Sequence, residues 1–206
     1  ITYSSYLKID ELTDLQVPLS DGEHDETLFI IIHQVYELWF KQILHEMRFL
    51  QKALEKGDSA TSQKTLNRIL KILKVMVSQV DVLETMTPLD FLSFRERLAN
   101  SSGFQSYQFR EFEIRLGKRK REMLNNYKEV SKAHQTLVQA LDENTLFDSF
   151  LKFLAKQDYS VPEDAFYKED QELPEPNEDL QDLLLKIYQE SPETSQICER
   201  LVDLDE

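Results

Sequence analysis

The chain has 206 residues, of which 41% are hydrophobic and 30% charged, and its formal net charge at pH 7 is −14. This composition is typical of a globular protein with a sizeable core, and the negative charge argues against partners such as nucleic acid or an anionic membrane. No apolar run has the length of a membrane span, and the single cysteine, Cys198, excludes an internal disulfide framework and fits a cytoplasmic protein.

The sequence predicts an all-α fold. Only four glycines and six prolines interrupt a chain rich in helix formers, and the alternating pattern of strands is nearly absent. Apolar residues at helical spacing predict two long antiparallel helices over about 24–56 and 60–86, with Gly57 closing the first. We therefore expect one helical-bundle domain over residues 1–206.

Further helices are expected along the rest of the chain. Thr87 can cap a helix that has Pro88 in its first turn and ends near Asn100. Additional helices are predicted over about 105–117, 121–141, 143–156, 178–190 and 193–204. Between them, residues 158–179 hold nine acidic residues, one lysine and three prolines, so this segment is expected to be a mobile, solvated connection within the domain.

One stripe of the first long helix combines aromatic rings with a histidine. Phe29, His33, Tyr36 and Phe40 follow at helical spacing, so an imidazole lies one turn after a phenyl ring on an apolar face. Such a histidine is either a hydrogen-bonded core residue or part of a functional site.

Two later features have the same double interpretation. Arg95 follows Phe91 by one helical turn, and its guanidinium is either a surface cation or a group that binds a carboxylate through paired hydrogen bonds. The run Ser101-Ser102-Gly103 is either an ordinary helix-breaking loop or a place where the backbone approaches a ligand closely.

Three stretches carry a resemblance to a known family. They are TYSSYLKIDEL (residues 2–12), HDETLFIIIHQVYELWFKQIL (24–44), and VLETMTPLDFLSFR (82–95) with the nearby SSGFQS (101–106). In amino-acid sequence, order and separation these stretches resemble the tryptophan 2,3-dioxygenases, and the resemblance covers nearly the whole chain. It implies the all-α haem-dioxygenase fold and an enzyme that uses haem b and O2 to open the indole ring of L-tryptophan, giving N-formylkynurenine.

The resemblance also implies roles for the residues of the second and third stretches. His33 is expected to be the catalytic histidine of the distal haem pocket, facing the indole nitrogen, while Phe29 packs against the indole. Phe91 should shape the same pocket, and Arg95 should bind the α-carboxylate of the substrate.

The remaining matched residues are expected to contact the cofactor or a neighbouring subunit. Ser102, Gly103 and Phe104 match the segment beside the haem and its propionates. Tyr3, Tyr6 and Leu7 match an N-terminal segment that, in the family, closes the active site of the adjacent subunit of a homotetramer.

The family's proximal haem ligand has no counterpart in these residues. It is a histidine in a W-R-x-x-H-type segment that would follow Glu206, and His24, His45 and His134 do not match it. We therefore expect no metal ligand in this chain, and we expect the 206 residues to be part of a longer protein and inactive on their own. The alternatives are a related haem enzyme for a modified indole or another aromatic amino acid, and a non-catalytic helical scaffold.

Overall fold

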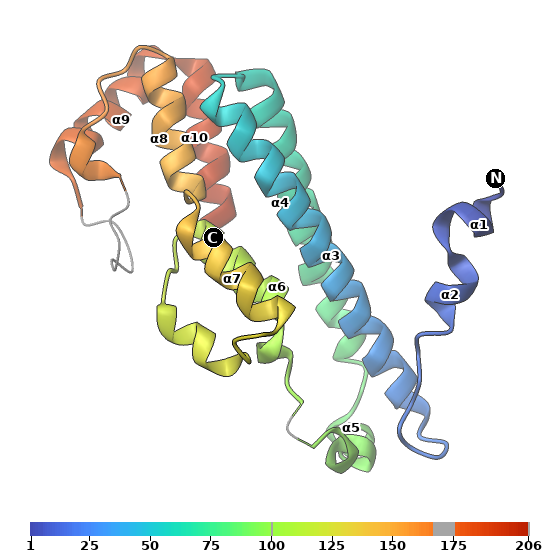
Figure 1. Cartoon of the computed structure of the whole chain (residues 1–206). Coiled ribbons are helices and arrows are strands. Elements are labelled where there is room, and N and C mark those ends of the chain that lie inside the picture. Colours follow the sequence, from blue (N-terminus) through green and yellow to red (C-terminus); the bar gives the residue numbers. More distant parts are fainter. Residues whose placement is uncertain (100, 167–175, 206) are drawn as a thin grey trace.

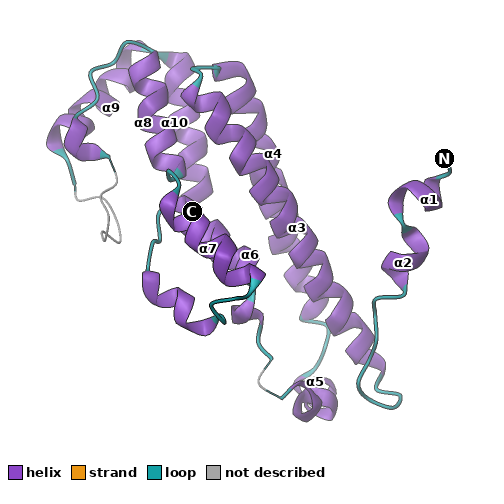
Figure 2. Cartoon of the chain, in the orientation of Figure 1, coloured by secondary structure: helices purple, strands orange, loops and turns teal. Residues whose placement is uncertain are grey.

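The computed structural model describes residues 1–99, 101–166 and 176–205, and every regular element in these ranges is helical (Figure 2). The predicted all-α class is therefore confirmed. The central part of the connection predicted over 158–179 lies outside the described residues, because residues 167–175 are not among them. In the described ranges, no helix combines the length and the apolar composition that crossing a bilayer requires.

Two long antiparallel helices, α3 (His24–Glu55) and α4 (Ser59–Leu83), form a central hairpin (Figure 1). The turn depends on Gly57, whose φ of +76° lies in the left-handed region that favours glycine. Asp58 then caps α4 by accepting a hydrogen bond from the backbone N–H of Thr61 at 3.0 Å. The two long helices predicted over 24–56 and 60–86 are confirmed.

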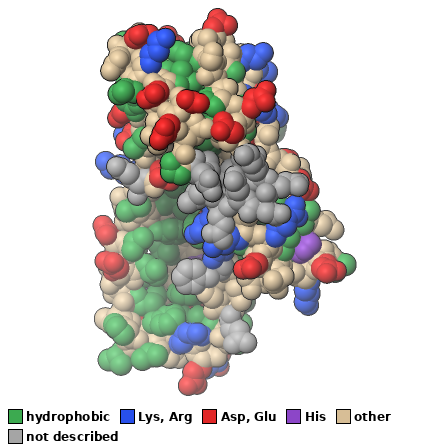
Figure 3. Space-filling view, turned by 90° about the vertical axis from the view of Figure 1, so that its left-hand side faces the viewer, with side chains coloured by type: hydrophobic (Ala, Val, Ile, Leu, Met, Phe, Trp, Pro, Cys, Tyr) green, Lys and Arg blue, Asp and Glu red, His purple; other side chains and the backbone are tan. Residues whose placement is uncertain are grey.

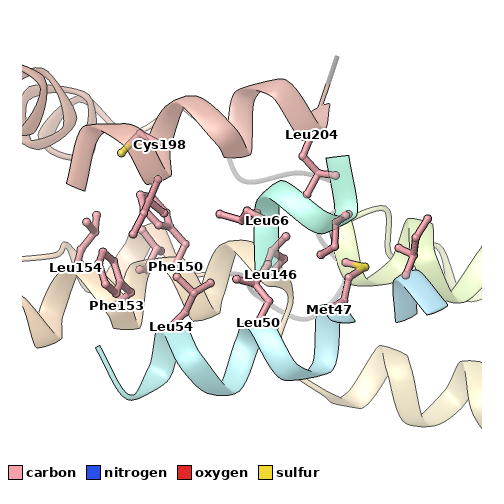
Figure 4. Close-up of a cluster of buried hydrophobic side chains, with 14 of the residues drawn as sticks. Met47, Leu50, Leu54, Leu66, Leu146, Phe150, Phe153, Leu154, Cys198 and Leu204 are labelled. Atoms are coloured by element: carbon pink, nitrogen blue, oxygen red, sulfur yellow. The ribbon is translucent and has the colours of Figure 1, made fainter. Parts of the chain in front are cut away.

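The main core lies at the turn end of this hairpin. Helix α8 (Leu146–Lys156) packs on α3, α10 (Pro192–Asp205) packs on α4, and α9 (Glu178–Glu190) packs on α10 (Figure 1). Figure 4 shows apolar side chains from these elements meeting between the helices, among them Met47, Leu50, Leu54, Leu66, Phe150, Leu154 and Leu204. Burial of these side chains removes a large apolar area from water and stabilises this end of the molecule.

Helix α6 (Tyr107–Leu116) lies beside the middle of α3, and α7 (Lys132–Asp142) packs on α6. The single helix predicted over 121–141 is wrong in its first half. Residues Arg121–Asn126 form the 3-10 helix η3, and the chain is extended at Tyr127. The reason is that the Ser131 hydroxyl accepts a hydrogen bond from the backbone N–H of His134 at 3.1 Å, which starts a new helix at Lys132.

A buried ion network fixes α6 against α3. The guanidinium of Arg115, 3% exposed, donates to Glu111 at 2.9 Å and to Glu143 at 2.9 Å. Arg48 of α3 also donates to Glu111, so one buried carboxylate joins the two helices. The two buried charges, Glu111 and Arg115, each have two partners of opposite charge, which offsets the desolvation cost of burying them.

The N-terminal residues form an arm that stands away from the helical body (Figure 1). Its two short helices, α1 (Tyr3–Leu7) and α2 (Ile9–Thr13), contain no buried residue and were not predicted from the sequence. The arm is attached through Glu26, 1% exposed, which accepts hydrogen bonds from the backbone N–H of Leu19 at 2.7 Å and of Ser20 at 2.8 Å. Although burial favours the neutral acid, the hydrogen bonds from Ser20 and Leu19 keep the pKa of Glu26 below its ordinary value.

Candidate active site

A cleft lies between the N-terminal half of α3 and the segment that leads into α6. It consists of two cavities of about 380 Å³ and 250 Å³, which share His33, Glu37, Ser102, Gly103 and Ser106 in their walls. The larger cavity is otherwise lined by apolar and aromatic side chains: Ile32, Tyr36, Phe40, Leu83 and Phe109. A mostly apolar cleft with a few converging polar groups is the usual form of a small-molecule or cofactor site.

The hydrogen bond of His33 defines what its ring offers to the cleft. Its Nδ1 lies 2.7 Å from the carbonyl oxygen of Phe29, one turn earlier in α3. A carbonyl oxygen can only accept, so Nδ1 carries the hydrogen, and in the neutral ring Nε2 is an acceptor. Nε2 faces Gly103, where an added Cβ would lie 4.0 Å from it. His33 therefore presents a hydrogen-bond acceptor to the space beside Gly103.

Three phenyl rings form one wall beside His33. The ring of Phe29 lies 4.1 Å from the imidazole, 5.8 Å from Phe91 and 5.6 Å from Phe94, measured between centroids. The predicted neighbours Phe29 and Phe91 are thus brought together from different helices. Phe94, which is fully buried, was not predicted as part of this wall, although its position three residues after Phe91 places it on the same helix face.

Helix α5 (Pro88–Arg95) carries Phe91, Phe94 and Arg95, and it begins as predicted. Thr87 and Asp90 form a capping box, and the hydrogen bonds from Thr87 lower the pKa of the Asp90 carboxyl. The predicted end near Asn100 is too late. The α-helix stops at Arg95, the 3-10 helix η1 covers Glu96–Leu98, and Ala99 leaves the helical region with φ of +48°.

Arg95 lies at the edge of this aromatic wall. Its Cζ is 6.0 Å from the centroid of the Phe91 ring, and one of its terminal nitrogens donates to the carbonyl of Ala99 at 3.0 Å. Arg95 is not among the residues that line either cavity. The guanidinium is therefore held next to the wall by contacts within its own segment. A guanidinium has five N–H donors, which can form paired hydrogen bonds with a carboxylate.

The polar loop opposite His33 contains two of the three residues predicted there. Ser102 and Gly103 line both cavities, whereas the side chain of Phe104 lies outside the part of the chain that the structure describes. Ser106 on the loop side and Glu37 on α3 also line both cavities and were missed, as was Gln108, which lines neither cavity but contacts Glu37. For Glu37 a signal existed, because it follows His33 by one helical turn on the same stripe.

Tyr3, Tyr6 and Leu7 do not reach the cleft within one chain. They lie in the arm and are 77%, 74% and 42% exposed. Their predicted role toward a neighbouring subunit stays a prediction.

The other histidines stand apart from the cleft. His24 begins α3 without capping it, His45 is exposed, and His134 lies on α7. Among the described residues there is no cluster of three or more His, Cys, Asp or Glu side chains that could hold a metal ion.

Comparison with known proteins places these features in one family. A sequence model of tryptophan 2,3-dioxygenase matches residues 1–206. The chain is 48% identical over 207 residues to the tryptophan 2,3-dioxygenase of Herpetosiphon aurantiacus, covering 100% of this chain and 79% of that relative. The corresponding protein of Anaeromyxobacter sp. strain K is 48% identical over 214 residues, with coverages of 100% and 77%. That of Caulobacter vibrioides is 41% identical over 209 residues, with coverages of 100% and 79%.

These similarities extend over the whole chain and include the stretches that build the cleft. The resemblance seen in the sequence is therefore confirmed, and the chain belongs to the tryptophan 2,3-dioxygenase family.

Proposed function

We propose that this chain is the main part of an enzyme that opens the indole ring of L-tryptophan with O2, giving N-formylkynurenine. The observation that carries the proposal is the pairing of an acceptor nitrogen, His33 Nε2, with the phenyl ring of Phe29 in the wall of one cleft, where the ring of Phe91 packs on Phe29. An indole has a flat apolar face and one N–H donor, so this wall and this acceptor match its two recognition elements. Family membership supports the same reaction.

Each predicted residue receives a role that its surroundings support. Phe29 and Phe91 would stack against the indole, and His33 would accept the hydrogen bond of the indole N–H. Arg95 would bind the α-carboxylate through the N–H groups that Ala99 leaves free. The contribution of the protein is then to orient the substrate and to exclude water.

The larger cavity fits one face of a haem. Its walls are mostly apolar and aromatic, and the only histidine in them is His33, whose Nε2 faces Gly103. Ile32, Phe40, Leu83 and Phe109 would contact the flat ring, with Ser102 and Gly103 at its edge. Haem b, when bound, supplies the oxygen chemistry.

We further propose that the protein works in the cytoplasm as a homotetramer in which the arm of one subunit closes the cleft of another. Large apolar side chains are exposed on the cleft half of the molecule, and Figure 3 shows hydrophobic side chains gathered over the lower half of one face. The exposed ones include Ile31, Leu38, Val75, Val77, Val80, Leu89 and Leu92. An exposed apolar surface of this kind supports assembly, and the arm itself buries nothing in a single chain.

The reaction is tested with the complete protein loaded with haem. L-Tryptophan and ¹⁸O2 should give N-formylkynurenine that contains two ¹⁸O atoms, as measured by mass spectrometry. A product with one ¹⁸O atom, or turnover of other aromatic amino acids but not of tryptophan, would contradict the proposal.

A further inference from the structure

Glu37 and Gln108 join α3 to the first turn of α6 directly beside the cleft. The side-chain nitrogen of Gln108 donates to the carboxylate of Glu37 at 2.7 Å and to the backbone carbonyl of the same residue at 2.9 Å. An amide nitrogen has two hydrogens, so both donors of Gln108 are used on Glu37. We refer to this pair as the Glu37–Gln108 clamp.

The position of Glu37 is unusual for a carboxylate. It lies one turn after His33 and lines both cavities, and among the residues lining the larger cavity it is the only acidic one. Placing a charge against an apolar cavity has a desolvation cost, which a hydrogen bond to the charged group offsets in part. A residue that only filled space at this position would not need a charge.

The clamp acts on residues 103–106 because hydrogen bonds at the start of α6 connect these residues to Gln108. Ser106 caps α6 by accepting a hydrogen bond from the N–H of Phe109 at 3.1 Å. The N–H of Ser106 in turn donates to the carbonyl of Gly103 at 3.2 Å. The chain from Gly103 to Gln108 is thus a short hydrogen-bonded unit, and its far end is fixed on Glu37.

We propose that Glu37 is a positioning residue: through Gln108 it sets the distance between the Gly103–Ser106 side of the cleft and His33. This distance defines the width available to a flat ligand, since Gly103 faces Nε2 of His33 without a side chain. The inference rests on the proposed function, in which haem and tryptophan occupy the cleft.

The test compares three variants of the complete protein. Gln108→Glu places a second carboxylate next to that of Glu37, and the repulsion between the two negative charges should widen the cleft. KM for tryptophan and the dissociation constant of haem, followed by its Soret absorption, should each rise about tenfold, with kcat within about twofold of the unmodified protein. The double variant Glu37→Gln/Gln108→Glu restores one side-chain hydrogen bond with donor and acceptor exchanged, but not the bond to the backbone carbonyl of residue 37. It should therefore recover the part of both losses that comes from the repulsion between the two carboxylates.

Gln139→Glu is the matched control. Gln139 donates to Glu143 at 2.8 Å on the exposed side of α7, so this variant makes the same chemical change away from the cleft. It should leave KM and haem binding unchanged. If Gln108→Glu does not fold, Gln108→Ala takes its place, because it removes both hydrogen bonds without repulsion and should raise both constants about fivefold.

Two results would overturn the proposal. One is unchanged KM and haem binding in every folded variant at Gln108, and the other is a double variant no better than Gln108→Glu. Failure of the unmodified complete protein to bind haem or to convert tryptophan would instead contradict the proposed function, so the two failures are distinguishable.

Discussion

The orientation and tautomer of the His33 ring are set by a hydrogen bond to its own helix. Because Nδ1 donates to the carbonyl of Phe29, the neutral ring turns an acceptor toward the cleft, and the same contact holds the imidazole 4.1 Å from the phenyl ring. Under the proposed function, recognition of the indole would depend on two residues one turn apart. The sequence predicted this pair and its helix, but the tautomer followed only from the distance to the carbonyl oxygen.

Gly103 gives the first prediction at this scale. A Cβ there meets only Nε2 of His33, at 4.0 Å, and the position requires no left-handed backbone. Gly103→Ala should change the free energy of unfolding by less than about 0.5 kcal/mol. The methyl group would occupy the space in front of Nε2, so the affinity for tryptophan should fall about tenfold.

Gly57→Ala is the matched comparison, with the opposite result. Gly57 has φ of +76°, and a Cβ there would lie 3.3 Å from side-chain atoms of Lys156 and Gln157. This variant should lose about 1 kcal/mol or more of stability and keep its tryptophan affinity. Calorimetry and ligand titration of both variants measure the two effects, and a Gly103→Ala protein with unchanged tryptophan affinity would contradict the assigned geometry.

At the scale of elements, the sequence predicted helices well where apolar periodicity is long. Helices α3, α4 and α9 match their predicted ranges closely because a long amphipathic pattern averages out local preferences. The prediction failed at 121–141, where the capping hydroxyl of Ser131 starts a new helix. It also missed α1 and α2, since each has only five residues and no buried face.

The loop between the arm and α3 gives a pH prediction. The folded-state pKa of Glu26 is lowered, so its carboxylate stabilises the loop fully above the unfolded-state pKa, about 4.3 for glutamate. That stabilisation is lost as the pH falls through the lowered folded-state value. Amide hydrogens of Leu19 and Ser20 should then exchange faster with solvent, while those of the main core stay protected.

Glu26→Gln provides the control for this loop. The amide keeps the size of the side chain but removes the titrating group, so exchange at Leu19 and Ser20 should be faster at neutral pH and should no longer change in this acidic range. Exchange in the unmodified protein that is independent of pH after correction for the intrinsic rate would show that Glu26 does not anchor the loop.

At the scale of the whole molecule, the main core and the cleft lie at opposite ends of the α3–α4 hairpin (Figure 1). The turn end is closed by α8 and α10, whereas the cleft end exposes apolar side chains and carries an arm with no buried residue. Sequence periodicity could predict the core, because its residues repeat within single helices. It could not predict that Phe29 and Ser102 line one cleft with Phe91 packed on Phe29, since this depends on how separate segments pack.

The arm gives a prediction about assembly. If the arm of one subunit completes the cleft of another, a Tyr3→Ala/Tyr6→Ala protein and an Arg95→Ala protein carry complementary defects. Coexpression of the two should form mixed oligomers in which some clefts are intact, so activity should exceed that of either variant alone. Equal activity in the mixture and in the separate variants would contradict an exchange of arms.

The central claim is that Nε2 of His33 accepts the N–H of the indole, and a thermodynamic cycle tests it most directly. Binding of L-tryptophan and of 1-methyl-L-tryptophan, which lacks this N–H, is measured for the haem-loaded unmodified protein and for His33→Ala. The unmodified protein should bind L-tryptophan about tenfold more tightly than the methylated compound, and His33→Ala should bind both with similar affinity. A preference of the same size in both proteins would contradict the assignment.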